Sequence, residues 1–296
     1  MRWTANWMKP AALLLAGLLA ACQSTQEGPA ASSAPVASAS VQTVSLPAVS
    51  YAPSTAVERG YSALVLDAAS GEELYAVNAD AARFPASLTK MMTLYLLFDA
   101  VSNGRYSLST PLKVSANAAS QPPAKIGLKA GSTITVEQAA RALAVKSAND
   151  VAVAIAENLA GSEDAFARQM TQQARAMGLG RTRFVNATGL PEPAQVTTAS
   201  DMAKLGLALK RHFPQYASYY RATSYSYGGR SFRATNNLLG KVPGVDGLKT
   251  GYIRLSGYNL VATANRGGKQ LIVVVMGGES ESARDEEVTR LIEAHF

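Results

Sequence analysis

The chain has 296 residues and a mass of 31.0 kDa, with 48% hydrophobic and 17% charged residues, so it can bury a sizeable core. Its cysteine is Cys22, and its histidines are His212 and His295. These counts exclude an internal disulfide, leave almost no Cys/His zinc site and allow a Ser-His-Asp triad only through His212, so we expect no metal and no cofactor. The net charge of +7 suits a polyanionic neighbour. Because the basic residues are dispersed and accompany no base-reading motif, we do not expect nucleic acid to be that neighbour.

Residues 1–21 have the features of an export signal. Arg2 and Lys9 precede an apolar segment, residues 11–21, that is too short to span a bilayer. The end of this segment and Cys22 resemble the lipobox of bacterial lipoproteins, in which the cysteine is lipidated and becomes the new N-terminus. We therefore expect a lipoprotein on the periplasmic side, in the outer membrane if the cell has one. The alternative is a conventional cleavage site beside an ordinary Cys22.

Residues 22–55 follow as the lipidated cysteine and a linker. The segment consists mainly of Ala, Ser, Pro, Thr and Val, carries almost no charge, and shows no helical or strand period. Such a composition is typical of a tether without a packed core. The sequence therefore predicts that the folded domain occupies residues 56–296.

The folded part begins and ends with strand-like segments. Residues 61–66 and 73–77 read as a hairpin around a turn, and residues 258–264 and 270–276 repeat the pattern before a helix at 282–294. Apolar residues recur at helical spacing between them, in residues 88–101, 136–146, 150–159, 162–177 and 200–210. We expect an α/β (α+β) fold: an antiparallel sheet built from both ends, flanked by helices, with an inserted all-helical subdomain and a cleft where the two meet.

The first motif is a serine three residues before a lysine. Pro85 at the first helical position and an apolar run after Lys90 place Ser87 in the first turn of a buried helix. Ser87 and Lys90 then lie on one face, one turn apart. A lysine in an apolar cleft disfavours its ammonium form and can act as a base. The alternative is an N-terminal serine and an exposed lysine without chemistry.

The second motif is Ser-x-Asn, which occurs twice. Ser147 and Asn149 fall at the break between two apolar helical segments, so their side chains can project into a cleft, although an N-cap serine is the simpler alternative. Ser115 and Asn117 lie in a polar stretch, where we expect a turn or a helix cap.

The third motif is Lys249-Thr250-Gly251, preceded by a glycine-containing segment. Glycine permits close approach of backbones, and we expect an extended run to present the lysine and the threonine toward one side. A cation beside a hydroxyl makes a site for a carboxylate.

The order SxxK, SxN and KTG is the signature of penicillin-binding proteins and class A β-lactamases. Over residues 58–285 the chain resembles the D-alanyl-D-alanine carboxypeptidases among the low-molecular-mass penicillin-binding proteins. The similarity extends to residues 87–93, 122–131, 145–151, 184–190, 201–203 and 243–261. This resemblance implies a β-lactamase/transpeptidase-like fold.

The resemblance also implies a mechanism. Ser87 would attack the carbonyl between the last two D-alanines of a peptidoglycan stem peptide while Lys90 takes its proton, forming an acyl-enzyme. Ser147 would relay a proton to the leaving amine, and Asn149 would hold the substrate amide. A β-lactam would acylate Ser87 in the same way.

In the same resemblance the KTG segment binds the other end of the substrate. Lys249 and Thr250, followed by Gly251, would bind the terminal carboxylate. The backbone N–H groups of Ser87 and Tyr252 would form the oxyanion hole. The pair Tyr252-Ile253 stands where several family members carry His-Thr or Phe-Thr, which leaves the details of the substrate open.

Three alternatives remain at this point. A class A β-lactamase needs a glutamate between the second and third motifs, for which Glu192 is the nearest candidate. A D,D-endopeptidase of peptidoglycan crosslinks would use the same residues as a carboxypeptidase. A non-catalytic cell-wall-binding lipoprotein is the third possibility, although Ser87 and Lys90 are both present.

Overall fold

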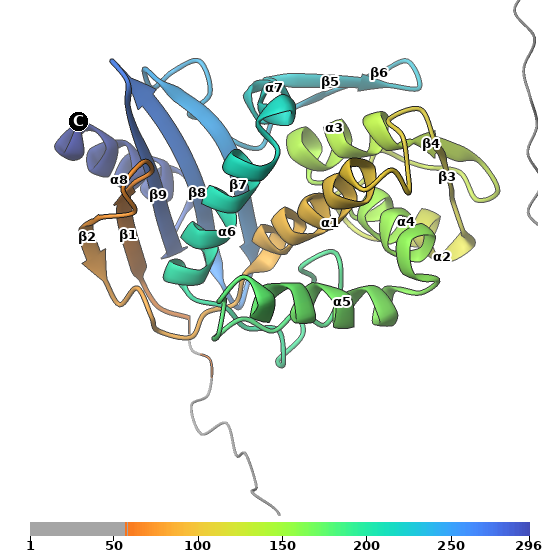
Figure 1. The fold of residues 1–296 in the computed structure, drawn as a ribbon, viewed down its shortest axis with the longest axis horizontal. Coiled ribbons are helices and arrows are strands. Elements are labelled where there is room, and N and C mark those ends of the chain that lie inside the picture. The colour runs from red at the N-terminus through yellow and green to blue at the C-terminus, as the bar shows by residue number, and fades with distance from the viewer. Residues whose placement is uncertain (1–56, 58) are drawn as a thin grey trace, which may run out of the picture. The chain divides into compact units, whose positions relative to one another are not determined.

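The computed structural model describes residue 57 and residues 59–296 (Figure 1). The predicted signal peptide, Cys22 and the linker lie outside these described residues. Among the described helices, none has the length and apolar character needed to cross a membrane.

A five-stranded antiparallel sheet in the order β2-β1-β9-β8-β7 organises the domain. Its strands are β1 (Ser62–Asp67), β2 (Glu73–Val77), β7 (Val245–Ile253), β8 (Gly257–Arg266) and β9 (Lys269–Gly278). Both predicted hairpins are confirmed. The hairpin β1–β2 and the hairpin β8–β9 form one sheet because β1 pairs with β9, with Ala63 opposite Val275. The strand β7, which carries the third motif, therefore lies at an edge of the sheet.

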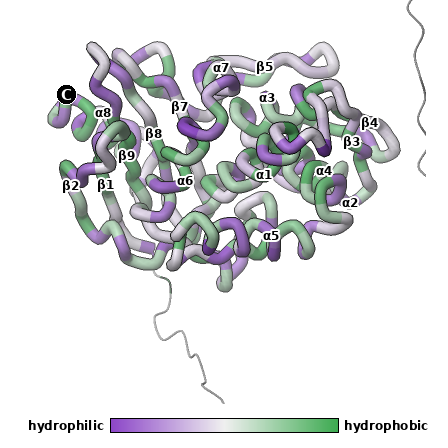
Figure 2. Tube along the Cα trace, in the orientation of Figure 1, coloured by the Kyte–Doolittle hydropathy of each residue, from purple (hydrophilic) through white to green (hydrophobic). Residues whose placement is uncertain are grey.

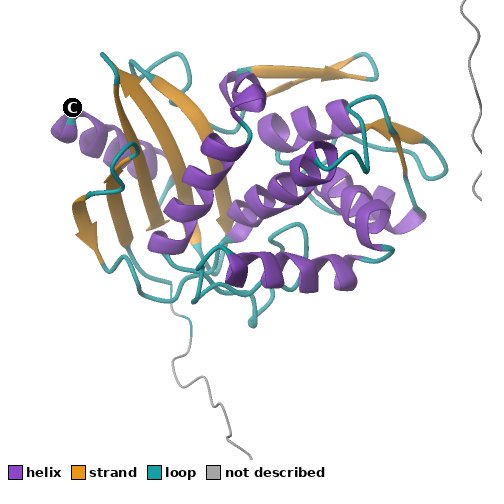
Figure 3. Ribbon diagram, in the orientation of Figure 1, coloured by secondary structure: helices purple, strands orange, loops and turns teal. Residues whose placement is uncertain are grey.

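Helices cover the two faces of this sheet (Figures 1 and 3). Alternate residues of a strand point to opposite faces, so each strand can contribute side chains to a hydrophobic core on either face of the sheet. The helix α8 (Glu281–His295), predicted at 282–294, packs on one face, and α6 (Ala199–His212) on the other. The α8 face buries Ala63, Val65, Leu260, Ala262, Val273, Val275, Val288, Leu291 and Ile292. The α6 face includes Leu64, Val261, Ile272, Val274 and Met276, and joins the larger helical core.

The remaining helices surround α1 (Lys90–Ser102), which follows a single 3-10 turn, Ala86–Thr89. Since α1 is apolar on nearly every side, it is buried in the middle of the helical region (Figure 2). Around it lie α3 (Val136–Lys146), α4 (Asn149–Ala160), α5 (Glu163–Ala176) and α6. The predicted helices are confirmed to within two residues at each end.

We had expected an all-helical inserted subdomain, but the structure shows that it also contains strands. It contains two short strand pairs, β3 (Pro111–Lys113) with β4 (Thr133–Thr135), and β5 (Ser224–Tyr227) with β6 (Arg230–Arg233). Segments of three or four residues are too short for a hydrophobic period to reveal them. The short elements α2 (Ala116–Ser120), the 3-10 turn Pro214–Tyr216 and α7 (Ala217–Arg221) complete the region. The predicted cap is confirmed, because Ser115 Oγ accepts the Ala118 amide at 2.9 Å.

The pairing of the two ends of the domain leads to a prediction about Gly277, which has a φ of 84°. A Cβ atom on Gly277 would lie 2.0 Å from the Gly60 carbonyl oxygen, whereas one on Gly268, with a φ of 90°, would contact nothing within 4 Å. Both alanine variants suffer left-handed strain of about 1–2 kcal/mol. We expect Gly277→Ala to lose about 1–3 kcal/mol more than Gly268→Ala in urea unfolding. Equal losses would mean that the contact between the two ends is loose.

Candidate active site

Ser87 and Lys90 meet at the start of α1. Ser87 lies within the 3-10 turn, which is tighter than the α-helical first turn that we expected, and α1 begins at Lys90 itself. The Lys90 Nζ atom is 3.0 Å from Ser87 Oγ. The preceding Ala86 has a φ of 48°, a left-handed conformation that costs energy for a residue with a Cβ and re-aims the chain at the serine.

The Lys90 amine has no access to solvent, with an exposed fraction of 0%. It donates a hydrogen bond to the Thr188 carbonyl at 2.5 Å. Burial, and next the positive charge of Lys249, hold the pKa of Lys90 well below its usual value, while the carboxylates of Glu163 and Asp150 act in the opposite direction. A neutral amine next to a hydroxyl is the arrangement that removes a proton from it.

Close backbone contacts hold Ser87 against the sheet. A Cβ atom on Gly251 of β7 would lie 3.0 Å from the Ser87 amide nitrogen, and one on Gly189 would lie 1.9 Å from the Ala86 carbonyl oxygen. The buried Asn259 of β8 donates to the carbonyls of Phe84 and Pro85 at 3.1 and 3.2 Å. The 3-10 turn is therefore pinned to the strand that carries the third motif.

Ser147 occupies the corner between α3 and α4. It is the C-cap of α3, with a φ of 61°, and the N-cap of α4 is Ala148, so the alternative reading of Ser147 as an N-cap is wrong. Within the described residues, the buried Ser147 Oγ atom has no hydrogen-bond partner. An unpaired buried hydroxyl facing a cleft is available to a ligand.

Asn149 lies behind this corner. Its amide group donates to the Pro122 carbonyl at 2.5 Å, and its backbone N–H donates to Ala124 at 2.6 Å. Asn149 is not among the residues that line the cleft, although Ala124 is. The structure thus uses Asn149 to hold the loop that forms one wall.

Asp150, which the sequence analysis did not single out, fixes the same loop. Its buried carboxylate accepts the amides of Ile126, Gly127 and Leu128 at 3.3, 2.9 and 3.0 Å. No local signal distinguishes this residue from an ordinary first-turn aspartate, because these three partners are more than 20 residues away.

We expected Lys249 and Thr250 to face one side, but of the two only Thr250 is among the residues that line the cleft. Thr250 lines the cleft and donates to Thr235 Oγ1 at 2.7 Å. Lys249 is 2% exposed, and its amine donates to the Thr250 carbonyl at 2.8 Å. Burial, and secondarily the charge of Arg284, lower the pKa of Lys249 to about 7.

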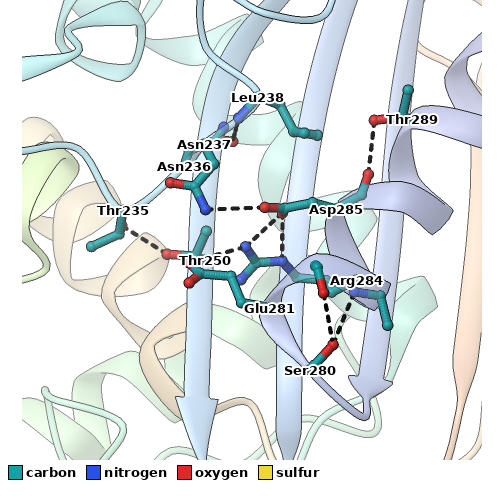
Figure 4. Close-up of polar contacts among 12 residues, drawn as sticks. Thr235, Asn236, Asn237, Leu238, Thr250, Ser280, Glu281, Arg284, Asp285 and Thr289 are labelled. Carbon is teal, nitrogen blue, oxygen red and sulfur yellow. Dashed lines mark hydrogen bonds and ion pairs between the residues drawn. The ribbon is translucent and has the colours of Figure 1, made fainter.

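Arg284, like Thr250, lines the cleft, and it carries a positive charge (Figure 4). It lies in the first turn of α8, is 2% exposed and pairs with Asp285 at 2.6 Å and with Glu281 at 3.6 Å. Asn237 donates to the other Asp285 oxygen at 3.1 Å. Arg284 could not be singled out from the sequence because it is one of several charged residues on that helix, and only the fold shows which of them is buried.

The cleft itself has a volume of about 230 Å³. It is lined by Ser87, Ala124, Lys146, Ser147, Thr235, Thr250, Gly251, Tyr252, Tyr258, Glu281 and Arg284. Tyr252 is 53% exposed and stacks on Tyr258 with 4.2 Å between ring centroids, so the pair forms an aromatic rim. Glu192 is exposed and does not line the cleft, which argues against the β-lactamase alternative. A larger hollow of about 920 Å³ beside Tyr61 and Glu287 lacks a serine–lysine pair.

Comparisons with known proteins identify relatives of this chain. The family model described as D-alanyl-D-alanine carboxypeptidase (Peptidase_S11) matches residues 50–280. The Escherichia coli D-alanyl-D-alanine carboxypeptidase DacA is 37% identical over 78% of this chain and 59% of its own length. A D-alanyl-D-alanine endopeptidase of Pseudomonas aeruginosa is 30% identical over 72% of this chain and 70% of its own. The chain spans about three fifths of the length of the first curated relatives it matches.

Among solved structures, penicillin-binding protein D2 of Listeria monocytogenes in its ampicillin-bound form matches with a TM-score of 0.69 and 32% identity. The match covers 78% of this chain and 95% of that one. The expected penicillin-binding-protein fold is therefore confirmed.

The low pKa of Lys249 predicts how stability depends on pH. Between pH 7 and 10.5 the unfolded chain binds a proton that the folded lysine lacks, so the free energy of unfolding rises with pH, by at most about 1.4 kcal/mol per unit for one proton. Lys90 contributes in the same direction. We expect Lys249→Met to flatten the rise measured by urea unfolding between pH 7 and 9, and Lys241→Met, at an exposed lysine, to leave it unchanged. An unaltered slope in Lys249→Met would show that Lys249 is charged in the folded protein.

Proposed function

Because this chain belongs to the D-alanyl-D-alanine carboxypeptidase family, we propose that it is a serine-type carboxypeptidase of peptidoglycan stem peptides. It removes the terminal D-alanine through an acyl-enzyme on Ser87. The observation that carries this proposal is the 3.0 Å approach of the buried Lys90 amine to Ser87 Oγ beside the cleft.

Acylation follows from this pair. The neutral Lys90 amine takes the Ser87 proton as Oγ attacks the carbonyl carbon of the bond between the last two D-alanines. The backbone N–H groups of Ser87 and Tyr252 stabilise the resulting oxyanion, and one such donor is typically worth a factor of about 10²–10³ in rate. The amide bond then breaks, and Ser147 passes the proton to the leaving amine, so that free D-alanine departs. Asn149, through the loop that it holds, shapes the wall for the substrate amide.

The anionic end of the peptide is bound at the opposite end of the cleft. Thr250 offers a hydroxyl, and Lys249 and Arg284 provide positive potential. A carboxylate placed beside Lys249 favours its charged form, so substrate binding above pH 7 draws a proton onto this lysine. Water then hydrolyses the acyl ester and releases the shortened peptide.

The partners of this activity are peptidoglycan stem peptides and, as inhibitors, β-lactams. The strained β-lactam amide presents a carbonyl and a carboxylate at the spacing of the dipeptide, so it acylates the same serine. The ampicillin-bound form of the Listeria protein supports this part of the proposal.

A D,D-endopeptidase is the second candidate, and the Pseudomonas relative of that name favours it. Both reactions cleave an amide after a D-alanine with the same nucleophile. They differ in the leaving group, which is free D-alanine in one case and a second stem peptide in the other.

The location proposed for the enzyme is the periplasmic side of a membrane. The family acts on a polymer outside the cytoplasm, and residues 1–21 with Cys22 carry the features of a lipoprotein signal. Two or more acyl chains on Cys22 give stable anchoring. The linker, residues 22–55, then lets the domain reach the cell wall.

Acylation tests the proposed pair. We expect Ser87→Ala to abolish labelling by a fluorescent penicillin, and Lys90→Ala to slow it by about 10²–10⁴, the usual contribution of a general base. The matched control is Ser115→Ala, which removes a helix cap from the other Ser-x-Asn sequence and should label at the normal rate. Labelling that persists in Ser87→Ala would refute the assignment of the nucleophile.

Product analysis separates the candidate reactions. Wild-type protein is incubated with a pentapeptide, a crosslinked muropeptide and a penicillin, and Ser87→Ala serves as the blank. We expect D-alanine from the pentapeptide at the fastest rate. Faster cleavage of the crosslink would favour the endopeptidase, and rapid turnover of penicillin would favour the β-lactamase.

The anchor is tested by Cys22→Ser. Without the thiol no lipid can be attached, so the variant should move from the membrane to the soluble fraction while its penicillin labelling is unchanged. A variant that still sediments with membranes would show that the chain is held by something other than this lipid.

A further inference from the structure

Glu163 lies in the first turn of α5, beside the loop that holds Lys90. Its side chain is partly buried, and Oε1 accepts a hydrogen bond from the Ala187 amide at 2.9 Å. It belongs to none of the three motifs and does not line the cleft.

The loop of residues 187–189 contacts the start of α1 at successive residues. The Ala187 carbonyl accepts the Thr93 hydroxyl at 2.9 Å, and the Thr188 carbonyl accepts the Lys90 amine at 2.5 Å. Gly189 packs directly on the Ala86 carbonyl. The loop therefore lies between α5 and the reactive pair, and Glu163 is its tie to α5.

Glu163 is also one of the charges around the Lys90 amine. Lys249 is the positive one, and Glu163 and Asp150 are the negative ones. Asp150 is committed to the amides of the loop at 126–128. Burial raises the pKa of Glu163, and Asp164 and Glu157 raise it further, whereas the Ala187 amide and the charge of Lys90 oppose that rise.

We propose that Glu163 is a positioning residue for acylation. It fixes the loop whose Thr188 carbonyl aims the Lys90 amine at Ser87, and its negative charge sets how readily that amine gives up its proton. This inference rests on the roles of Ser87 and Lys90 in the proposed function, and it requires no contact between Glu163 and substrate.

Two substitutions separate the two effects. Glu163→Gln keeps an oxygen that can accept the Ala187 amide but removes the charge, whereas Glu163→Ala removes both. Asp164→Asn is the matched control, since it removes a charge from the same turn of α5 at an exposed residue without a hydrogen bond to the loop.

The rate of labelling by a fluorescent penicillin is measured from pH 5 to pH 9. Because the Glu163 anion favours the protonated Lys90, its loss should move the acid limb of the profile to lower pH in Glu163→Gln and Glu163→Ala alike. The plateau should stay within about twofold of wild type in Glu163→Gln and fall by about tenfold in Glu163→Ala, as expected for one hydrogen bond. Asp164→Asn should leave both unchanged. An unmoved acid limb in Glu163→Gln, or a full plateau in Glu163→Ala, would overturn the proposal.

Two measurements that need no activity distinguish this outcome from failure of the proposed function. Titration of the ¹³Cε signal of Lys90 should show a lower midpoint in Glu163→Gln than in wild type. Hydrogen exchange at the amides of residues 187–189 should accelerate in Glu163→Ala and remain slow in Glu163→Gln. If wild-type protein is not labelled by penicillin, the proposed function fails, and an unshifted Lys90 midpoint or unchanged exchange would still overturn the role of Glu163.

Discussion

The site depends on the burial of one amine. The energetic cost of placing a charged lysine away from water lowers the pKa of Lys90, and the proposed role of this amine as a base requires that lowering. The Lys90 amine donates hydrogen bonds to the Thr188 carbonyl and to Ser87 Oγ, and these two partners fix its direction. When Lys249 is protonated, its positive charge favours the neutral form of Lys90.

The cleft lies where the edge of the sheet meets the helical region, at the border of a core that the two share. The sheet contributes the edge strand β7, and the helical region contributes the start of α1 and the corner at Ser147. Their spacing is set by contacts in which a side chain would not fit, as at Gly251, and by the buried amide of Asn259. The first of these contacts is between backbones and the second is made by a fully buried side chain, so both hold the residues before α1 firmly against the sheet.

The sequence was most informative where patterns are long or chemistry is specific. Hairpins at both ends and five helices follow from periodicity, and Ser87 with Lys90 follows from a spacing of three. Two features depend on contacts between residues far apart in the chain, which no local pattern encodes. They are the position of Arg284 in the cleft and the hydrogen bonds of Asp150 to the loop at 126–128. Lys249 is buried and does not line the cleft, and the three-residue motif alone did not indicate that burial.

The pairing of β1 with β9 also constrains how the domain is made. Ser62 and Met276 are neighbours in the sheet, yet more than 200 residues separate them along the chain, and contacts of such long range form slowly. A ribosome must complete nearly all of the domain before the first hairpin finds its partner. Until then β1 presents an unpaired apolar edge, which is a template for aggregation. A chain that ends before β9 would keep that edge permanently, so loss of the last strand removes the framework of the sheet as well as its C-terminal helix.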